Sequence, residues 1–137
     1  MITRRTAFGL VAAILGAVAV PTLSRPAVAA ERLPFDRAAF DAAMKSGKPV
    51  LIDISASWCP TCQRQKHILG ELTTQPKFAG YTIFEVNYDT QKDVMRSFGA
   101  RQRSTLIAFK DGYELGRTVG DTSVEGIEAL LATAVWG

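Results

Sequence analysis

The sequence has few of the side chains that bind metals or cross-link a fold. Its 137 residues include two cysteines and one histidine, and all three fall within residues 56–67, ASWCPTCQRQKH. Two thiols and one imidazole are one ligand short of a closed tetrahedral zinc site. The cysteines therefore form a structural disulfide, hold a softer metal or carry electrons, and their surroundings decide between these uses.

The sequence also lacks an apolar run that is long enough to span a bilayer. Residues 7–20 are apolar and uncharged, but a transmembrane helix needs about 20 such residues. Arg4 and Arg5 precede the run, and small residues follow it at 27–29. This order is typical of a secretory signal peptide, and the arginine pair fits either the Sec or the twin-arginine route.

An excess of basic charge is missing once the predicted signal peptide, residues 1–30, is set aside. This leader holds three arginines and no acid, so residues 31–137 carry 13 basic and 13 acidic side chains. No basic stripe remains to attract nucleic acid or an anionic membrane. We therefore expect residues 31–137 to form one exported, periplasmic domain that is monomeric and does not bind nucleic acid.

Within this domain, segments of helical and of strand character follow one another. Four apolar, β-branched segments have the pattern of strands, the first two of strands buried on both faces: 50–55, 81–87, 105–109 and 114–120. The turn signal Asp111-Gly112 makes the last two a hairpin. Four segments are predicted to be helices: 35–47, 59–75, 90–99 and 122–135. The order predicts an α/β fold, a three-layer α/β/α sandwich with a small mixed central sheet.

The two cysteines stand where a strand meets a helix, which favours reactivity over a structural disulfide. A loop closed over so few residues removes little entropy from the unfolded chain. Free N–H groups and the dipole at a helix N-terminus stabilise a thiolate, so Cys59 is expected to be the nucleophile. Cys62, one turn further, is expected to be shielded but within reach of the first sulfur, as in dithiol exchange.

Residues 50–62, VLIDISASWCPTC, resemble the thioredoxin superfamily, in which a strand with a buried Asp leads to Trp-Cys-x-x-Cys on a helix. The similarity covers nearly all of residues 31–137 and looks closest to exported bacterial thioredoxin-like thiol:disulfide interchange domains. It implies a thioredoxin fold, a redox-active Cys59–Cys62 disulfide, and no cofactor or resident metal. The implied partners are protein disulfides and a separate, membrane-borne thiol reductant.

The resemblance also assigns roles to single residues. By match, Cys59 is the exposed nucleophile and Cys62 the resolving thiol, while Trp58 packs beside the site or serves as a large core residue. Asp53 interrupts an apolar strand. If it is buried and unpaired beneath Cys62, its pKa is raised and it can exchange a proton with that thiol. The alternative is a surface carboxylate at the strand end.

The chain departs from the family where a cis-proline usually faces the dithiol, because Ser104 stands there. A cis bond before serine costs about 2.5–4 kcal/mol, so we predict a trans bond and a shifted loop that brings an N–H and a hydroxyl near the sulfurs. Arg103 and Thr105 flank this position in the predicted substrate-binding loop. The backbone of Arg103 is expected to pair with a bound polypeptide and its charge to favour the Cys59 thiolate, unless it is a solvated loop arginine.

A second departure lies beside the buried carboxylate. Many family members pair it with a lysine on the neighbouring strand, but Glu85 takes the matching position here. If Glu85 approaches Asp53, two carboxylates share one site of low dielectric and the pKa of one of them rises further. The alternative is a Glu85 that faces outward.

These observations predict an exported oxidoreductase that reduces disulfides of periplasmic proteins through the WCPTC dithiol. Strong oxidants need a greatly stabilised thiolate, and the residues between the cysteines, Pro60 and Thr61, include no cation. Disulfide oxidation or isomerisation is a variant of this function. The alternative from another class is a periplasmic copper-binding protein that uses the same cysteines, with His67 as a further ligand.

Overall fold

The structure, a computed structural model, describes residues 16, 19, 21 and 30–136. The predicted signal peptide lies almost wholly outside the described residues, so its existence, cleavage and export route stay predictions. Among the residues that are described, no helix is both long and apolar enough to cross a membrane.

The described chain contains every helix and strand that the sequence predicts, and one strand more. The added strand, β1, opens the domain and shifts the order to β-α-β-α-β-α-β-β-α. The elements are β1 (Glu31–Pro34), α1 (Arg37–Lys45), β2 (Val50–Ser55), α2 (Pro60–Leu72), β3 (Thr82–Asn87), α3 (Lys92–Ser97), β4 (Thr105–Lys110), β5 (Tyr113–Val119) and α4 (Val124–Thr133).

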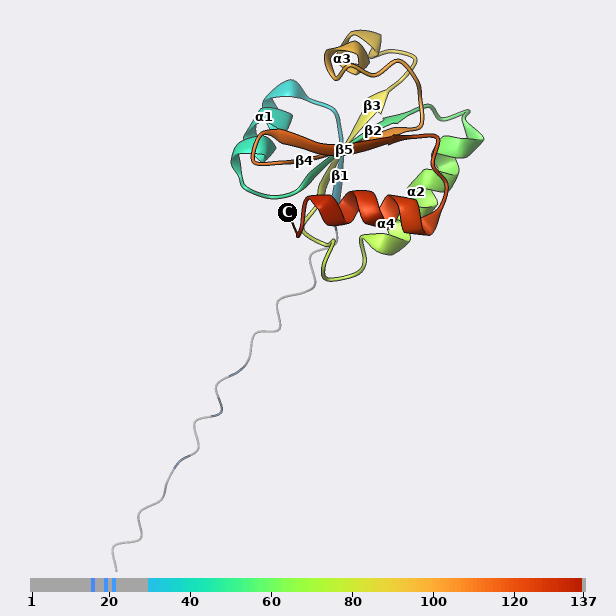
Figure 1. Cartoon of the computed structure of the whole chain (residues 1–137). Helices are drawn as coiled ribbons and strands as arrows, with labels where there is room; N and C mark the ends of the chain where they lie inside the picture. Colours follow the sequence, from blue (N-terminus) through green and yellow to red (C-terminus); the bar gives the residue numbers. More distant parts are fainter. Residues whose placement is uncertain (1–15, 17–18, 20, 22–29, 137) are drawn as a thin grey trace, which may run out of the picture.

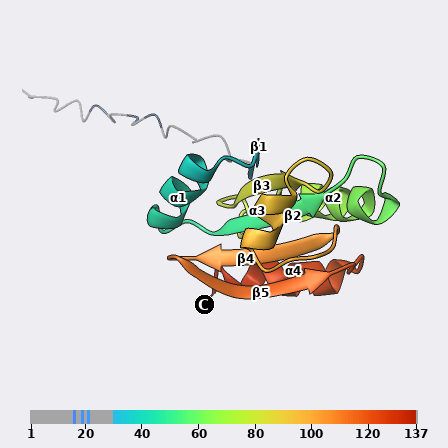
Figure 2. The same ribbon diagram turned by 90° about the horizontal axis from the view of Figure 1, so that it is seen from above.

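The five strands form one mixed sheet in the order β1-β3-β2-β4-β5. Strands β1, β3 and β2 run parallel, while β4 is antiparallel to β2 and forms a hairpin with β5. Helices α1 and α3 cover one face of the sheet, and α2 and α4 cover the other (Figures 1 and 2). This arrangement confirms the predicted three-layer sandwich with a mixed sheet.

Alternation along the central strand β2 divides the core into two halves. Val50, Ile52 and Ile54 point into the half beneath α1 and α3, where five phenylalanine rings pack mostly edge to face. Leu51 points into the half beneath α2 and α4. Asp53 shares this second face with Leu51, because successive side chains in a strand point to opposite faces. The carboxylate of β2 is therefore directed towards the helix that carries the cysteines.

The topology brings three chain segments together at the carboxyl end of β2. The first is the turn that leads from β2 into α2, in which the N–H of Cys59 donates to the carbonyl of Ala56 (3.2 Å). The second follows β3, where the N–H of Tyr88 donates to the carbonyl of Ser55 (2.9 Å). The third is the loop before β4, which is tied to the carbonyl of Ile54. The candidate site lies where these three segments meet.

Candidate active site

Cys59 caps the N-terminus of α2, as its position in the sequence predicts. Its backbone is extended (φ −89°, ψ 114°), and its sulfur accepts a hydrogen bond from the N–H of Cys62 at 3.2 Å. Pro60 occupies the first turn of the helix, where the missing N–H costs nothing. The sulfur therefore takes the place of the usual capping oxygen and faces the positive end of the helix.

Cys62 is buried as predicted, but Cys59 is more buried than predicted. Cys62 is fully buried, as predicted, but Cys59 is 2 % exposed although it was expected to be open to solvent. Cys59 packs with Ala56 and Tyr88, and the Ser104 hydroxyl lies 3.4 Å from its sulfur. The prediction of an exposed nucleophile is thus wrong, because Cys59 is packed among these neighbours.

The pKa of Cys59 is nevertheless lowered, from 9.0 to about 7. Burial alone would raise it. Hydrogen bonds from the side chain of Cys62, the hydroxyl of Ser104, the backbone of Cys62 and the side chain of Arg103 more than offset that effect. These hydrogen-bond donors stabilise the thiolate of Cys59. With a pKa of about 7, Cys59 is partly ionised at neutral pH although it is buried.

Ser104 adopts a left-handed backbone conformation (φ 58°), and no peptide bond of the described chain is cis. The predicted trans bond is thereby confirmed. The Ser104 hydroxyl lies 3.1 Å from the Cys62 sulfur and 3.4 Å from that of Cys59. The N–H of Ser104, however, donates to the carbonyl of Ile54 (2.8 Å) and does not serve the sulfurs. The predicted hydroxyl near the sulfurs is therefore confirmed, but the predicted N–H is wrong, because the backbone N–H of Ser104 is bonded to β2.

Gln65 fixes this strained position, and the sequence reasoning did not identify it. The side chain is fully buried, and its amide nitrogen donates to the carbonyls of Ser104 (3.0 Å) and Asp121 (2.9 Å). The carbonyl of Ser104 also accepts from the N–H of Gly120 (2.9 Å). A positive φ at a residue other than glycine persists where its surroundings over-determine it. A signal existed in the sequence, since Gln65 follows Cys62 by three positions and so shares its helix face.

Trp58 lies on the surface beside the dithiol and is not a core residue. It is 56 % exposed, and its indole N–H donates to a carboxylate oxygen of Asp89 at 2.9 Å. Its ring meets that of Tyr88 edge to face with the centroids 6.4 Å apart. The guanidinium carbon of Arg103 lies 4.7 Å from the centroid of the indole. The indole of Trp58 therefore lies between the carboxylate of Asp89 and the guanidinium of Arg103.

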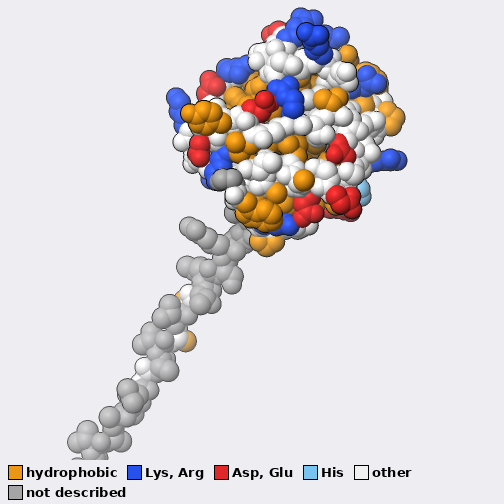
Figure 3. All heavy atoms as spheres, viewed as in Figure 1, with side chains coloured by type: hydrophobic (Ala, Val, Ile, Leu, Met, Phe, Trp, Pro, Cys, Tyr) orange, Lys and Arg blue, Asp and Glu red, His pale blue; other side chains and the backbone are white. Residues whose placement is uncertain are grey.

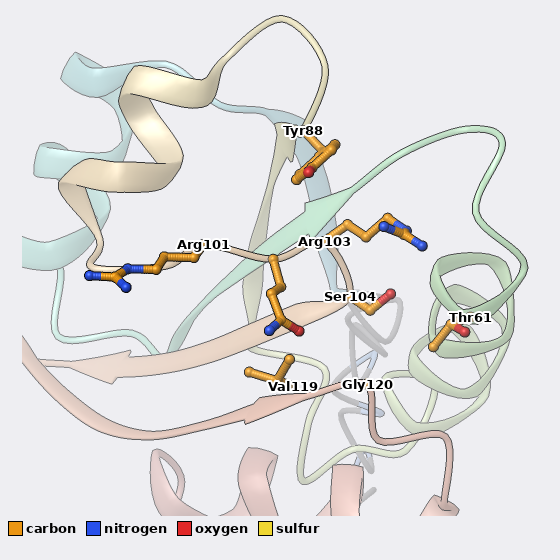
Figure 4. A pocket seen from close by; sticks show the side chains of 8 residues that line it. Thr61, Tyr88, Arg101, Arg103, Ser104, Val119 and Gly120 are labelled. Carbon is orange, nitrogen blue, oxygen red and sulfur yellow. The ribbon is translucent and has the colours of Figure 1, made fainter.

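Arg103 and Thr105 border Ser104 in different ways. The Arg103 side chain extends from the loop towards the start of α2 (Figure 4) and helps to lower the pKa of Cys59. No residue of the described chain accepts from the N–H of Arg103 or donates to its carbonyl. Thr105 is 1 % exposed, and its hydroxyl donates to the carbonyl of Gln102 (2.7 Å). Arg103 is thus open to a partner, whereas Thr105 braces the loop from inside.

Asp53 is fully buried, which excludes the surface alternative. Burial raises its pKa above 3.8, and this effect exceeds the lowering by a hydrogen bond and the charge of Arg32. The expectation of an unpaired carboxylate is wrong, because Arg32 donates to one carboxylate oxygen at 2.8 Å. The other oxygen, Oδ1, has no hydrogen-bond partner among the residues that the structure describes. Arg32 was missed because strand β1, which carries it, was not predicted.

Glu85 lies opposite Asp53 in the register of β2 and β3. Its carboxylate is 3.4 Å from the guanidinium of Arg32 and 2.7 Å from the ammonium of Lys66. The charge of Glu85 contributes to the raised pKa of Asp53. Glu85 therefore neither faces away nor shares a proton directly with Asp53, because Arg32 stands between the two carboxylates. Arg32, on β1, and Lys66, on α2, supply the positive charge beside these carboxylates.

His67 lies on the exposed side of α2, away from the buried thiol of Cys62. Its side chain is 76 % exposed, and its ring nitrogen is 3.3 Å from Glu71, one turn further along the helix. Within the described part of the chain, no group of three His, Cys, Asp or Glu side chains is arranged to hold a metal ion. The structure thus gives no support to His67 as a ligand beside the cysteines.

Comparison with known sequences yields matches over most of the described domain. The family model named Thioredoxin matches residues 31–133. A thioredoxin of Mycobacterium tuberculosis is 36% identical over 88 residues, which are 64% of this chain and 72% of the relative. A thioredoxin of Alicyclobacillus acidocaldarius is 33% identical over 93 residues, which are 68% of this chain and 88% of the relative.

Comparison with solved structures agrees. The crystal structure of Trxlp from Edwardsiella tarda matches with a TM-score of 0.71 and 42% identity, covering 74% of this chain and 98% of that protein. A thioredoxin from Malassezia sympodialis matches with a TM-score of 0.68, covering 78% of this chain and 92% of its own. Its sequence is 20% identical, so this second likeness concerns the fold alone.

Proposed function

This chain belongs to the thioredoxin family and is a thiol-disulfide oxidoreductase, and from that premise we propose that it reduces the disulfides of exported proteins in the periplasm. The lowered pKa of Cys59, about 7, carries the direction of this proposal. Reducing dithiols of this fold have a nucleophile with a pKa of about 7, whereas strong oxidants lower it to about 3.5.

The reduction proceeds by two exchanges between sulfur atoms. The Cys59 thiolate attacks one sulfur of the substrate disulfide, which forms a mixed disulfide and releases the other substrate sulfur as a thiolate. Cys62, as its thiolate, then attacks the Cys59 sulfur, closes the Cys59–Cys62 disulfide and releases the second substrate sulfur. The substrate gains two electrons and binds two protons. A separate thiol reductant restores the dithiol by the reverse exchanges.

Asp53 is proposed to accept the proton of Cys62 during the second exchange. Its raised pKa suits a group that takes up a proton near neutral pH, and it faces the layer of α2. Replacing Asp53 by Asn should therefore slow the second exchange by about a hundredfold while the first is little changed. Mixed disulfide would then accumulate in a rapid-quench experiment with a peptide disulfide. Equal decay rates of the mixed disulfide in both proteins would contradict the role.

The direction of electron flow is tested by equilibrating the purified protein with glutathione buffers of known potential. A midpoint close to about −270 mV supports the reductant, and one close to about −120 mV supports an oxidase. Reduction of insulin disulfides by the protein and a thiol donor, abolished in Cys59→Ser, provides the activity test. Sustained turnover in the presence of a metal chelator would separate this function from copper binding.

The location and the partners are tested in cells of the source organism. N-terminal sequencing of the periplasmic fraction should find a chain that begins at Ala30 or Glu31, as cleavage after Ala29 or Ala30 requires. The variant Cys62→Ser can attack a disulfide but cannot release the product, so it should hold its substrates as mixed disulfides. A full-length protein found in the cytoplasm would refute the export proposal and leave the chemistry unaffected.

A further inference from the structure

A hollow of about 290 Å³ opens beside the dithiol. Its walls are the loop before β4, the end of β5 and the first turn of α2, and Ser104 is part of its lining (Figure 4). The hydroxyl of Ser104 contacts both sulfurs, so the hollow lies next to the dithiol. A polypeptide whose disulfide reaches Cys59 therefore places its neighbouring side chains in or next to this hollow.

Two exposed arginines, Arg101 and Arg103, line the hollow together. Within the described chain neither forms an ion pair, whereas Arg32, Lys66 and Arg117 all do. Figure 4 shows the two side chains extending in different directions from the loop, one towards the start of α2 and the other beneath α3. Arg103 lies over the Trp58 ring and helps to lower the pKa of Cys59, so Arg101 is the arginine of this lining whose charge is not used by the dithiol.

More basic side chains surround the hollow. Arg64 borders a second, smaller hollow that shares Thr61 and Gly120 with the first. Arg96 and Arg101 together line a third at the end of α3. Lys and Arg side chains gather around α3 on the surface seen in Figure 3. The domain as a whole is neutral, and these arginines border the hollow or one of its two neighbours.

The nearby carboxylates do not cancel this charge at the hollow itself. None of the residues that line it is Asp or Glu. Asp89 accepts the indole N–H of Trp58 (2.9 Å). Asp121, next to the lining residue Gly120, accepts the N–H and the hydroxyl of Ser123 (2.8 and 2.7 Å). Hydrogen bonds from neutral donors do not remove the charge of a carboxylate, but both acids lie outside the lining, so the hollow itself presents cations and uncharged groups.

From this arrangement we infer that the hollow binds carboxylate side chains of the substrate, so that the protein acts preferentially on polypeptide disulfides flanked by Asp or Glu. The inference rests on the proposed reduction of protein disulfides and adds a substrate class to it. Guanidinium groups bind carboxylates through paired hydrogen bonds. A field of this kind speeds the encounter with acidic substrates by about tenfold or more at low salt.

The test uses two synthetic peptide disulfides that differ only in the residues beside the cysteine, three Glu in one and three Gln in the other. The rate constant for their reduction by the full reduced protein is measured at low and at high ionic strength. We expect the Glu peptide to react about ten times faster at low salt. The ratio should fall towards one in about 1 M salt, where charges are screened beyond about 3 Å.

Variants identify the side chains that cause the preference. Arg101→Gln should reduce the ratio of the two rate constants severalfold, and Arg101→Glu should favour a matching peptide with three Lys. Lys45→Gln, which removes the same charge from the far end of α1, is the matched control and should leave the ratio unchanged. Equal rates for both peptides at low salt, or an equal loss in the Lys45 variant, would overturn the inference. A failure to reduce the Gln peptide would refute the proposed function instead.

Discussion

Two arginines contact residues of the site from different elements, and one is exposed to solvent while the other contacts a buried carboxylate. Arg103 lies at the surface, stacks on Trp58 and helps to lower the pKa of Cys59. Arg32 reaches in from the edge strand β1 and donates to the buried carboxylate of Asp53. The first interaction is open to solvent and salt, while the second offsets the cost of a charge in the protein interior.

The residues around the Cys59 sulfur and those around the Asp53 carboxylate also differ in kind. Near Arg103, the hydroxyl of Ser104 contacts both sulfurs. The backbone of Ser104 donates a hydrogen bond to β2 and accepts hydrogen bonds from α2 and from the chain after β5. On the buried side, Arg32, Glu85 and Lys66 form a chain of ion pairs that ends on Asp53. The contacts around Ser104 and Arg103, the surface side of the site, therefore depend on the backbone conformation of Ser104. The contacts around Asp53 and Arg32, the buried side, depend on the balance of charges.

Ser104→Pro would break the surface side most severely. Proline fixes φ near −65°, whereas Ser104 has φ 58°, and proline lacks the N–H that Ser104 donates to Ile54. We expect the free energy of unfolding to fall by about 3 kcal/mol or more, measured by denaturant unfolding. Ser104→Gly is the control and should retain most of the stability, because glycine adopts a positive φ without strain. A proline variant as stable as the native protein would refute the left-handed loop.

Arg32→Gln would break the buried side. It leaves Asp53 with Glu85 nearby and no cation in contact, so the free energy of unfolding should fall by about 2 kcal/mol, less than for a fully buried pair because Arg32 is partly exposed. Since burial raises the folded pKa of Asp53, the carboxylate is most costly above that pKa. The loss should therefore be largest at high pH and shrink as the pH falls through it.

Two further variants separate charge balance from packing in the buried network. Arg32→Lys retains the cation and should lose less stability than Arg32→Gln. The double variant Arg32→Gln/Asp53→Asn removes the uncompensated charge as well, so it should recover stability at high pH. A loss in Arg32→Gln that is the same at every pH would show that Arg32 contributes through its packing alone.

The sequence predicts most of the fold because the strong patterns belong to the central elements. The apolar, β-branched run of β2 and the Asp111-Gly112 turn each have a single simple interpretation. Strand β1 has four residues, exposed charges and one neighbour, so its pairing with β3 decides its conformation and no local pattern does. Arg32 could not be placed beside Asp53 without that strand.

The sequence predicts which residues form the site better than it predicts the contacts that those residues make. Cys59 at a helix start and Asp53 within a buried run are local signals, and both are confirmed in position. The contacts of Cys59 and Gln65 with Ser104 join residues that lie 45 and 39 positions apart in the sequence, and they depend on the path of the loop in which Ser104 has its left-handed φ. Long-range contacts of this kind have no counterpart in the pattern of neighbouring residues.

Ser104→Ala sharpens the comparison without disturbing the backbone. It removes the hydroxyl that lies 3.4 Å from the Cys59 sulfur and 3.1 Å from that of Cys62. The pKa of Cys59, about 7 in the native protein, should rise towards 9.0, and the thiolate fraction at neutral pH should fall about fivefold. Titration by thiolate absorbance measures the pKa. An unchanged value would show that the hydroxyl accepts a hydrogen bond from the thiols and does not donate one.

Arg103→Gln should have the smallest effect of these variants. Its hydrogen bond is the weakest of the four contributions that lower the pKa of Cys59, and the side chain is exposed to solvent. We expect a rise in the pKa that lowers the thiolate fraction at neutral pH less than about twofold, and a smaller rise at high salt. Arg32→Lys should show no such salt dependence in the thiolate titration, because the partner of Arg32 is the buried carboxylate of Asp53. If salt changed the pKa of Cys59 equally in both variants, the surface position of Arg103 and the buried contact of Arg32 would not explain different effects on the thiolate.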